Sequence, residues 1–477
     1  MRTLALVIAA ATALAAPANK LMTATNSRAK SARDSNLTVL YTCSAKGQIR
    51  SCNCTKFRFG GYGRAATLVS QIREKSDCLV LLEGGDALEW TGFQAEMKAE
   101  VTGKALKLMA YDVMIPGEDE VGKSGSQYIE QFDKTAAPVV CANYSKDGDN
   151  KPTYSTYRVI KTKSGLRVGV IGLLSPSVGR LFQEADFASK VTDPRKALKP
   201  ALAQASKEAD AIILVYHGPL SEAEKLATRG IDLILATHRT SRDVLFPEKG
   251  AESNEVDAPV KRQGDTVLVN AETNANWSLG RIDLHLKQGR AKSAKHKLLY
   301  LDRRYDEHPE MVKVYDDYNQ KVKSAVLAQS GQLKTDAEAL LKKRGLNLEQ
   351  MRARLRKSPF VTAGKCKGCH PEIYEIWTNS RHAKAMDTLK KTNQEFDPEC
   401  VSCHATGVMI RNGFANMKDT PELANVQCEA CHGPAEQHLA DTKKPYGEAG
   451  EMSCRACHTD ERTPEFDYEQ AWAQIMH

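Results

Sequence analysis

Four Cys-x-x-Cys-His pentads crowd the last quarter of the chain, and each combines two thiols with an imidazole. Two cysteines at this spacing can add across the two vinyl groups of one porphyrin, and the adjacent histidine can then bind the iron. Zinc ribbons and thiol oxidoreductases also use Cys-x-x-Cys pairs, but neither needs the histidine that follows every pair here. The sequence therefore predicts four haem c groups. Their attachment residues are Cys366, Cys369, Cys400, Cys403, Cys428, Cys431, Cys454 and Cys457, and their proximal iron ligands are His370, His404, His432 and His458.

Three histidines outside the pentads are candidates for the sixth iron position. His382 stands among small alanines on a helical stretch, so a porphyrin ring can approach it closely. His438 lies six residues after the third pentad, across a Gly-Pro turn, and His477 ends the chain after an amphipathic helix. One iron is then left without a partner in residues 361–477. His308 or Met409 could fill that position, since methionine is also a haem ligand.

The start of the chain indicates the cellular compartment in which the protein is located. A basic residue is followed by a short apolar run and a small-residue cleavage site, which is typical of a secretory signal peptide over residues 1–16. The run is too short to span a bilayer. Because haem is attached to such pentads outside the cytoplasm, we expect a periplasmic or cell-surface protein whose mature chain has no transmembrane segment.

Charge is shared unevenly along the chain. Residues 361–477 hold 12 Lys and Arg against 18 Asp and Glu, a net charge of −6, and the other 360 residues hold 55 against 41, a net charge of +14. Haem propionates would make the C-terminal end more acidic still. This asymmetry favours steering of charged redox partner proteins. No basic helix interleaved with aromatic residues stands out, so nucleic acid is not an expected partner.

Residues 37–302 alternate short apolar strands with amphipathic stretches, which predicts an α/β domain with a layered sheet packed by helices. The expected strands cover residues 37–41, 78–82, 167–173, 211–215 and 231–235, and a helical stretch covers 105–110. Polar residues gather where strands end, including Asp86, His217 and His238. This is where α/β proteins bind ligands.

The order of these motifs resembles the calcineurin-like metallophosphatases, and specifically the catalytic half of the periplasmic 5′-nucleotidase family. The resemblance includes Gly85-Asp86, the strand at 168–173, His217 and His238. It implies two metals that activate a hydroxide against phosphate esters. In that family the metals are held by an Asp-x-His after the first strand, the Gly-Asp aspartate, an Asn-His pair and two later histidines.

The chain departs from this ligand pattern at several positions. Ser44 and Lys46 stand where the first aspartate and histidine belong, and Thr240 takes the place of the last ligand. Glu118 and Asp119 replace the Asn-His pair. A standard two-metal phosphoesterase is therefore not expected. Two alternatives stay open: a scaffold without chemistry, or one divalent metal held by Asp86, Glu118, Asp119, His217 and His238.

Five cysteines lie outside the pentads, namely Cys43, Cys52, Cys54, Cys78 and Cys141. In an oxidising compartment the default is disulfides, and an odd number leaves one thiol over. Cysteines separated by one residue rarely bridge each other, so Cys43 is expected to pair with Cys52 or Cys54. A soft-metal site built from these thiols and His217 is the alternative.

Residues 303–360 change to Lys, Glu, Asp, Gln, Leu and Ala without a strand-like run, which predicts a helical connector. One helix is expected through Val312 and Leu327, and a second through Leu340, Leu341, Leu346 and Met351.

Residues 361–477 are too few to build a conventional core around four haems, so we expect a mostly α, haem-packed domain. Its segments at 366–389, 426–438 and 454–477 resemble the nitrifier-type tetrahaem cytochrome c family. The resemblance implies that His477 ligates an iron and that the haem on Cys400, Cys403 and His404 is five-coordinate.

The sequence thus predicts an extracytoplasmic electron carrier with an altered phosphatase-like domain. Two enzymatic alternatives stay open. One is a redox-linked, metal-dependent phosphoesterase or nucleotidase. The other is a haem oxidoreductase that acts on a small nitrogen or sulfur compound at an open iron.

Overall fold

The structure is a computed structural model, described here for residues 34–51, 59–89, 91–122, 126–149, 151–178, 189–238, 254–271, 276–344, 358–408, 410–444, 446–459, 462–463 and 466–477. The predicted signal peptide lies outside the described residues. So do six residues named above, Cys52, Cys54, Thr240, Leu346, Met351 and Met409.

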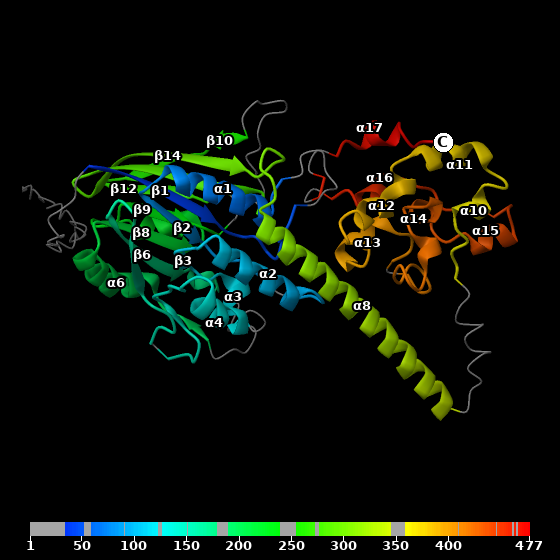
Figure 1. The fold of residues 1–477 in the computed structure, drawn as a ribbon, viewed down its shortest axis with the longest axis horizontal. Helices are drawn as coiled ribbons and strands as arrows, with labels where there is room; N and C mark the ends of the chain where they lie inside the picture. The colour runs from blue at the N-terminus through cyan, green and yellow to red at the C-terminus, as the bar shows by residue number, and fades with distance from the viewer. Residues whose placement is uncertain are drawn as a thin grey trace, which may run out of the picture.

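The molecule is elongated, with two parts side by side (Figure 1). Residues 34–302, the sheet region, contain the two large sheets. Residues 358–477, the C-terminal region, contain only short helices among the residues described there. The long helix α8, Pro309–Lys343, starts against the sheet region and passes beneath the C-terminal region.

The sheet region holds two six-stranded sheets. The first has the order β10-β14-β13-β1-β2-β3, with β1 parallel to β2 and antiparallel to β13. Its bounds are β1 Ser35–Thr42, β2 Leu79–Glu83, β3 Val113–Met114, β10 Glu255–Asp257, β13 Ser278–Lys287 and β14 Arg290–Tyr300.

The second sheet has the order β11-β12-β9-β8-β6-β5, in which β12, β9, β8 and β6 run parallel. Its bounds are β5 Tyr157–Lys161, β6 Arg167–Leu174, β8 Ala211–His217, β9 Leu233–Ala236, β11 Lys261–Gln263 and β12 Thr266–Asn270. The short strands β4, Tyr144–Ser145, and β7, Lys190–Val191, form a separate pair.

Alternation along the strands explains why the two sheets stack. Val39 of β1 and Val80 of β2 share one buried cluster with Val170 of β6 and Val215 of β8, so these faces meet between the sheets. Successive side chains point to opposite faces of a strand, and the outer faces are therefore also apolar and need helices to cover them.

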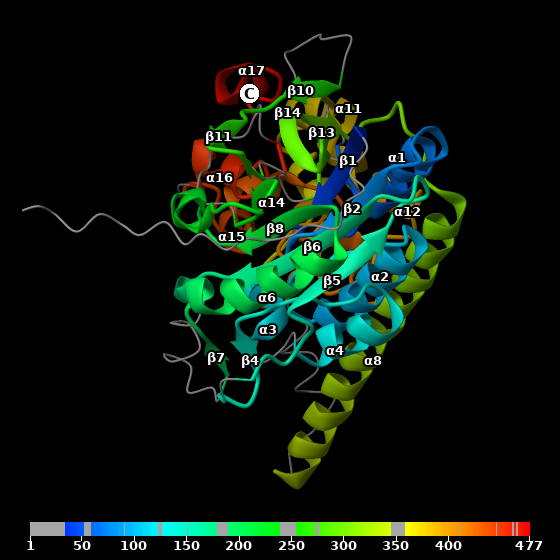
Figure 2. The ribbon, with the colours of Figure 1, turned by 90° about the vertical axis from the view of Figure 1, so that its left-hand side faces the viewer.

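Helices cover both outer faces (Figure 2). The first sheet packs against α1, α2 and α8, and the second against α6 and α7. Bounds in this region are α1 Tyr62–Lys75, α2 Ala95–Leu108, α3 Glu118–Val121, α4 Ser126–Thr135, α6 Pro194–Glu208, α7 Leu220–Ala223 and η1 Glu224–Leu226. The predicted α/β fold and all five predicted strands are confirmed. The sequence did not indicate that the strands divide between two sheets.

Helix α8 corrects the predicted connector. Leu340 and Leu341 do not begin a second helix, because they lie in the last turns of the same helix that starts at Pro309. The segment contains strong helix formers and no proline after its first residue, and the single Gly331 is too weak a breaker to end it. Among the described residues, no helix combines the length and apolar composition that crossing a membrane requires.

The C-terminal region is helical, as predicted, and its buried apolar core is small. Phe360, Met386, Leu389, Val401 and Phe414 are among the few buried apolar side chains there. The helices are α10 Ala363–Cys366, α11 Pro371–Asn379, η2 His382–Lys384, α12 Ala385–Lys390, α13 Pro398–His404, η3 Pro421–Leu423, α14 Cys428–His432, α15 Glu436–Ala440, α16 Glu451–Arg455 and α17 Tyr468–Trp472.

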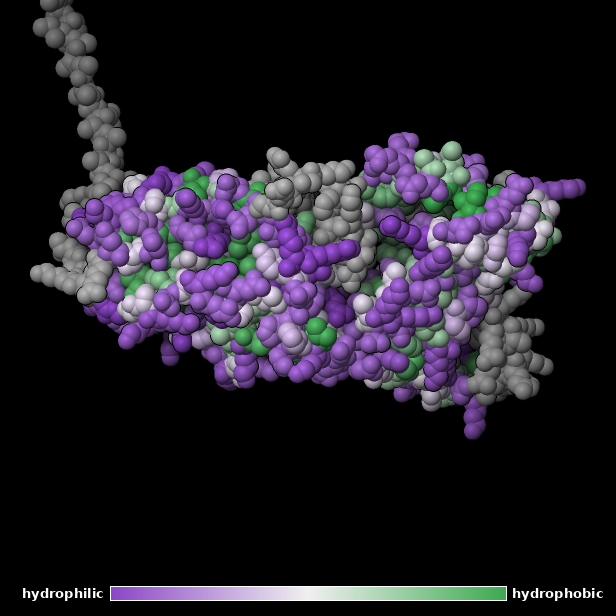
Figure 3. Space-filling model, turned by 45° about the horizontal axis from the view of Figure 1, so that its top comes forward, coloured by the Kyte–Doolittle hydropathy of each residue, from purple (hydrophilic) through white to green (hydrophobic). Residues whose placement is uncertain are grey.

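The face drawn in Figure 3 is mainly hydrophilic, with small apolar patches on both the sheet region and the C-terminal region. Exposed large apolar side chains in the C-terminal region include Ile376, Leu439, Met452 and Met476. The C-terminal region buries so little apolar surface that its own side chains do not suffice to stabilise its fold, and a further buried apolar group is needed.

Candidate functional site

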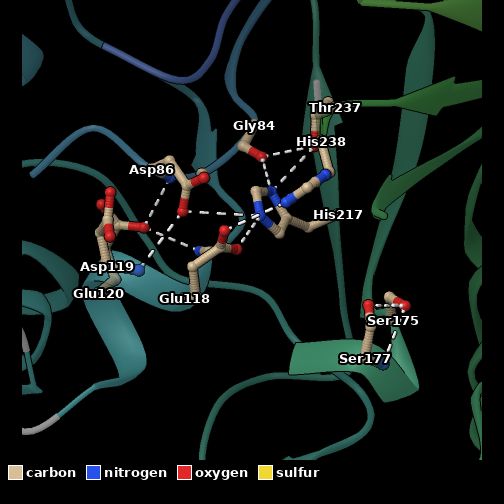
Figure 4. A network of polar contacts seen from close by, with 12 residues as sticks. Gly84, Asp86, Glu118, Asp119, Glu120, Ser175, Ser177, His217, Thr237 and His238 are labelled. Atoms are coloured by element: carbon tan, nitrogen blue, oxygen red, sulfur yellow. Dashed lines mark hydrogen bonds and ion pairs between the residues drawn. The ribbon is translucent and has the colours of Figure 1, made fainter. Parts of the chain in front are cut away.

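Four polar residues converge at the ends of strands of the sheet region (Figure 4). Asp86 follows β2, Glu118 opens α3, His217 ends β8 and His238 follows β9. Each offers a ligand atom, and these atoms all lie within 4.8 Å of one another. Two imidazoles with two carboxylates form a donor set suited to a divalent transition metal.

His217 is fixed so that one ring nitrogen faces the cluster. Its Nδ1 lies 2.9 Å from the carbonyl oxygen of Gly84, to which it donates, and its Nε2 lies 2.7 Å from a carboxylate oxygen of Glu118. The same Nε2 is 3.6 Å from Asp86. Hydrogen bonding of one nitrogen to a backbone carbonyl selects the tautomer that presents the other to a metal.

His238 approaches the same carboxylate from another strand. Its Nε2 lies 3.1 Å from Glu118, and its ring meets that of His217 edge-on at a centroid distance of 5.3 Å. Glu118 therefore bridges the two histidines. Burial alone would raise the pKa of Glu118. The hydrogen bonds that its carboxylate accepts from the two histidines outweigh burial and hold this pKa far below its ordinary value.

Two glycines let the backbone approach these side chains. A Cβ on Gly85 would lie 2.7 Å from His217 Nδ1, and one on Gly117 would lie 2.2 Å from Asp86 Oδ1. Gly85 also has a φ of 100°, which side-chain-bearing residues rarely adopt. Glycine is therefore required at positions 85 and 117, because a larger residue would collide with the side chains of the cluster.

Glu120 is a structural residue that the sequence reasoning missed. Its fully buried carboxylate accepts hydrogen bonds from the backbone N–H groups of Asp86 (2.8 Å), Ala87 (2.8 Å), Leu88 (3.0 Å) and Gly117 (2.8 Å). It therefore ties the loop after β2 to α3. A glutamate three residues after a helix N-cap is the sequence signal that could have identified it.

Asp119, the fifth predicted ligand, lies beside the cluster rather than in it. Its backbone N–H donates to Asp86 Oδ1 at 3.3 Å. Burial and the neighbouring Glu120 raise the pKa of Asp119 to about 7. Burial likewise raises the pKa of Asp86 to about 6, although His217 opposes the shift.

The cluster therefore concentrates negative charge. Burial lowers the pKa of His217, but Asp86 and Glu118 outweigh it and raise that pKa to about 9. The closely spaced carboxylates favour protonation of His217, Asp86 and Asp119. The same negative charge attracts a divalent cation, and the cation displaces these protons when it binds. The residues present fit one such ion.

The three described cysteines of the sheet region, Cys43, Cys78 and Cys141, are buried. Burial raises the pKa of Cys141 to about 12, so its thiol stays protonated. In the described part of the chain the metal-ligand cluster contains no thiol. The predicted partners of Cys43 are not described, and its pairing stays a prediction.

Each pentad of the C-terminal region forms part of a helical turn. The backbone N–H of His370 bonds to Cys366 at 2.9 Å, and that of His458 bonds to Cys454 at 2.9 Å. Residues three and four apart share a helix face, so the two thiols and the histidine point the same way. All eight pentad cysteines, each described, are free of disulfides and available for thioether bonds.

Backbone carbonyls orient two of the pentad histidines. His404 Nδ1 lies 2.7 Å from the carbonyl oxygen of Ala385, and His432 Nδ1 lies 2.7 Å from that of Gly447. In both residues the hydrogen bond occupies Nδ1, so Nε2 is the nitrogen that can bind a metal. Metal-ligating histidines commonly use one nitrogen for a hydrogen bond in this way.

Two predicted distal histidines face pentad histidines. The rings of His382 and His458 have centroids 6.4 Å apart, and those of His432 and His477 are 5.8 Å apart. Two metal–nitrogen bonds of about 2 Å each, extended to the ring centres, require a separation of roughly 6 Å. Burial, reinforced by His404, lowers the pKa of His382, which keeps it neutral as ligation requires.

The third predicted distal ligand, His438, is stacked on Tyr446 at a ring distance of 4.9 Å. Its Nδ1 is buried and has no hydrogen-bond partner among the described residues. The alternative ligand His308 instead caps α8, where its Nδ1 accepts from the N–H of Glu310 at 3.3 Å and its own N–H bonds to Gly63. That position lies at the start of α8, next to α1 of the sheet region.

Comparison with known proteins identifies this part of the chain. The family model described as cytochrome c554 and c-prime matches residues 365–433. Cytochrome c-554 of Nitrosomonas europaea is 34% identical over 111 residues, which cover 20% of this chain and 47% of that protein. The C-terminal region is of the cytochrome c554 type. Cytochromes of this kind carry haem c, and the pentads and facing histidines described above fit that group.

The sheet region is similar to other proteins. Protein UshA of Yersinia enterocolitica is 24% identical over 269 residues, covering 50% of this chain and 48% of that protein. The crystal structure of a 5′-nucleotidase precursor from Thermus thermophilus superposes with a TM-score of 0.50 at 18% identity, covering 61% of this chain and 59% of that chain. The sheet region therefore has the calcineurin-like phosphoesterase fold. The chain spans about half the length of each of these relatives.

The second pentad of the cytochrome c554-type region is held against the sheet region by buried polar contacts. Asp397 caps the pentad helix α13 by accepting from the N–H of Glu399 at 3.0 Å, and it also accepts from Gln94 Nε2 of the sheet region at 2.9 Å. Gln94 donates to Tyr318 of α8 at 2.6 Å. Lys98 of α2 pairs with Glu89 at 2.9 Å and with Glu399.

Proposed function

We propose that the protein is an extracytoplasmic multihaem cytochrome that relays electrons through four haem c groups in its C-terminal region. The observation that carries this proposal is the pairing of pentads. Helix α10, which ends at Cys366 of the first pentad, packs against α14, which begins at Cys428 of the third. Helix α14 also packs against α16, which contains Cys454 of the fourth pentad. Haems attached at these neighbouring pentads would lie close together, which would favour electron transfer between them. Each haem iron, when bound, takes up one electron on going from ferric to ferrous.

The facing rings support a ligand assignment for two haems. His382 with His458 would bind the haem of the fourth pentad, and His477 with His432 would bind that of the third. His438, with its buried unpartnered nitrogen, is a ligand for another iron. We assign the five-coordinate site to the haem on Cys400, Cys403 and His404, as the resemblance to the tetrahaem cytochromes implies.

The domain organisation belongs to the same proposal. Residues 1–16 are a signal peptide, residues 37–302 the phosphatase-like domain, residues 303–360 the connector and residues 361–477 the tetrahaem domain. Export fits the attachment of haem to cysteine pentads outside the cytoplasm and favours periplasmic or cell-surface placement. Redox partner proteins supply and remove the electrons.

The intact mass of the purified holoprotein tests the haem count. We expect an increase equal to four haems and a reversible, multi-step reduction in a visible-light redox titration. Replacing Cys454 and Cys457 by alanine should remove one haem, whereas replacing the buried Cys141 by alanine should remove none. A chain that carries fewer than four haems, or that cannot be reduced reversibly, would contradict the proposal.

A second candidate function rests on the cluster of Asp86, Glu118, His217 and His238, which fits one divalent metal. With such an ion bound, the sheet region would have a Lewis acid for hydrolysis of phosphate esters. We expect the full chain to hydrolyse a nucleoside monophosphate slowly with added Mn²⁺, and His217→Ala to abolish this activity. The exposed His285→Ala is the matched control. Hydrolysis that persists in His217→Ala would contradict this candidate, and so would the absence of hydrolysis by the unaltered protein.

A further inference from the structure

The loop after β1 brings a lysine into the acidic cluster. Lys46 Nζ lies 3.8 Å from Asp86 Oδ2. Its backbone N–H bonds to the carbonyl oxygen of Asp86 at 2.8 Å, and that of Ser44 bonds to Gly85 at 2.8 Å. The two loops are therefore joined through their backbones, which holds the lysine at the edge of the cluster.

The conformation of this loop is specific. Ser44 and Lys46 have φ angles of 54° and 46°, and Asp86 has 57°. Residues with a side chain adopt this left-handed region at a cost, so it persists only where surrounding contacts impose it. Asp86, Asp119, Glu118 and Glu120 all attract the ammonium group, and their combined charge outweighs burial and raises the pKa of Lys46. Lys46 is therefore a cation at the solvent-exposed edge of the cluster, beside Asp86.

The phosphoesterase fold implies a two-metal centre, and the residues present do not fit two metals. Among the described residues the cluster provides only four converging ligands, Asp86, Glu118, His217 and His238. At the positions where further ligands are needed stand Ser44, a hydroxyl, and Lys46, an ammonium that binds no metal. Positive charge close to Asp86 also repels a second cation.

We propose that Lys46 takes the place of a second metal ion, so that the cluster holds a single divalent transition metal. This inference rests on the second candidate function, namely that the cluster binds metal at all. The ammonium supplies positive charge beside Asp86 without coordination, and it weakens the binding of the one metal that the cluster holds. The cofactor class is a divalent ion that accepts two imidazoles and two carboxylates.

Manganese binding to the full-length holoprotein tests the stoichiometry. Mn²⁺ is titrated by calorimetry, and the manganese content after dialysis is measured by elemental analysis, which separates it from haem iron. We expect one Mn²⁺ per chain with the electron paramagnetic resonance signal of an isolated ion. No bound manganese would contradict the metal candidate itself. Two ions per chain, or a spin-coupled signal, would overturn the inference alone.

Substitution of the lysine tests its role. Lys46→Met should tighten Mn²⁺ binding about tenfold, because a charge that repels the metal is removed. Lys46→Arg keeps that charge and should bind as the unaltered protein does. The control is Lys163→Met, an exposed lysine in the turn before β6, at the end of the strand remote from the cluster. Unchanged or weaker binding by Lys46→Met would overturn the inference, and so would equal tightening by Lys46→Arg.

Discussion

Two buried histidines show how neighbours decide the role of a residue. His217 faces two carboxylates, which raise its pKa to about 9 against the effect of burial. His296 of β14 is buried with no described carboxylate beside it, and its Nε2 meets the hydroxyl of Tyr41 at 2.7 Å. Burial therefore lowers the pKa of His296 to about 4. The first is a candidate ligand and the second a structural residue.

His296 makes stability depend on acidity. Its folded pKa lies below the unfolded value of about 6.5, so its contribution is full above pH 6.5 and is lost as pH falls towards 4. We expect a loss of about 3 kcal/mol of unfolding free energy over this window. Chemical denaturation between pH 4 and 7.5 measures it. His296→Gln should flatten the curve, and the exposed His285→Gln should leave it unchanged.

Glu120 supports the cluster without being one of its ligands. Glu120→Ala removes the acceptor of four buried backbone N–H groups and leaves them without partners. We expect it to lower the unfolding free energy by about 3 kcal/mol or more. Thermal denaturation compared with Glu74→Ala, an exposed glutamate on α1, measures the effect. A loss no larger than that of the control would show that the loop after β2 is held by other contacts.

At the scale of elements, α2 and α8 form a platform for the second pentad. Gln94, Lys98 and Tyr318 come from this platform, and Asp397 and Glu399 come from the first turn of α13. All but Glu399 are buried. Cys400 follows directly, so these contacts would position a haem attached at the second pentad. The sheet region would thus form part of the surroundings of that haem.

Lys98 is the central charge of this platform. Lys98→Met would leave Glu89 and Glu399 without their cation, and we expect a loss of about 3 kcal/mol in unfolding free energy. We also expect Lys98→Met to increase the rate of hydrogen–deuterium exchange more in α13 than in α14. Lys104→Met is the matched control, because this lysine lies on the same helix in exposed ion pairs and should cost less than about 1 kcal/mol. Equal effects of the two substitutions would contradict the role of the platform.

At the scale of the molecule, a basic part is joined to an acidic part of the cytochrome c554 type. The net charges are +14 for residues 1–360 and −6 for residues 361–477 before haem propionates are counted. The buried contacts at α13 hold the two parts together, so a charged partner that approaches the C-terminal region meets the field of both parts. Long-range fields of this kind act mainly on association rates.

Salt dependence tests this charge distribution. We expect a small cationic electron donor to reduce the haems more slowly as ionic strength rises, because salt screens its attraction to the acidic region. A small anionic donor should react faster as ionic strength rises. Stopped-flow absorbance at about 20 to 500 mM salt, conditions that span Debye lengths from about 20 Å to about 4 Å, measures both rates. The same salt trend for both donors would show that local contacts, rather than net charge, govern electron entry.

The sequence by itself determined the class of each part of the chain and the local geometry of the cysteine pentads. The cysteine pentads are local, because two thiols and a histidine share a helix face whatever surrounds them. The strands were equally readable, since alternation of apolar residues sets them residue by residue. Only the tertiary structure decided which distant residues meet. It brought the ring of His382 close to that of His458 and packed the first pentad against the third. It also placed Lys46 beside Asp86, left Asp119 outside the cluster and continued one helix through Leu340. The physical reason is that these contacts depend on how sheets, helices and loops pack across long separations in the chain, which spacing within a motif does not encode.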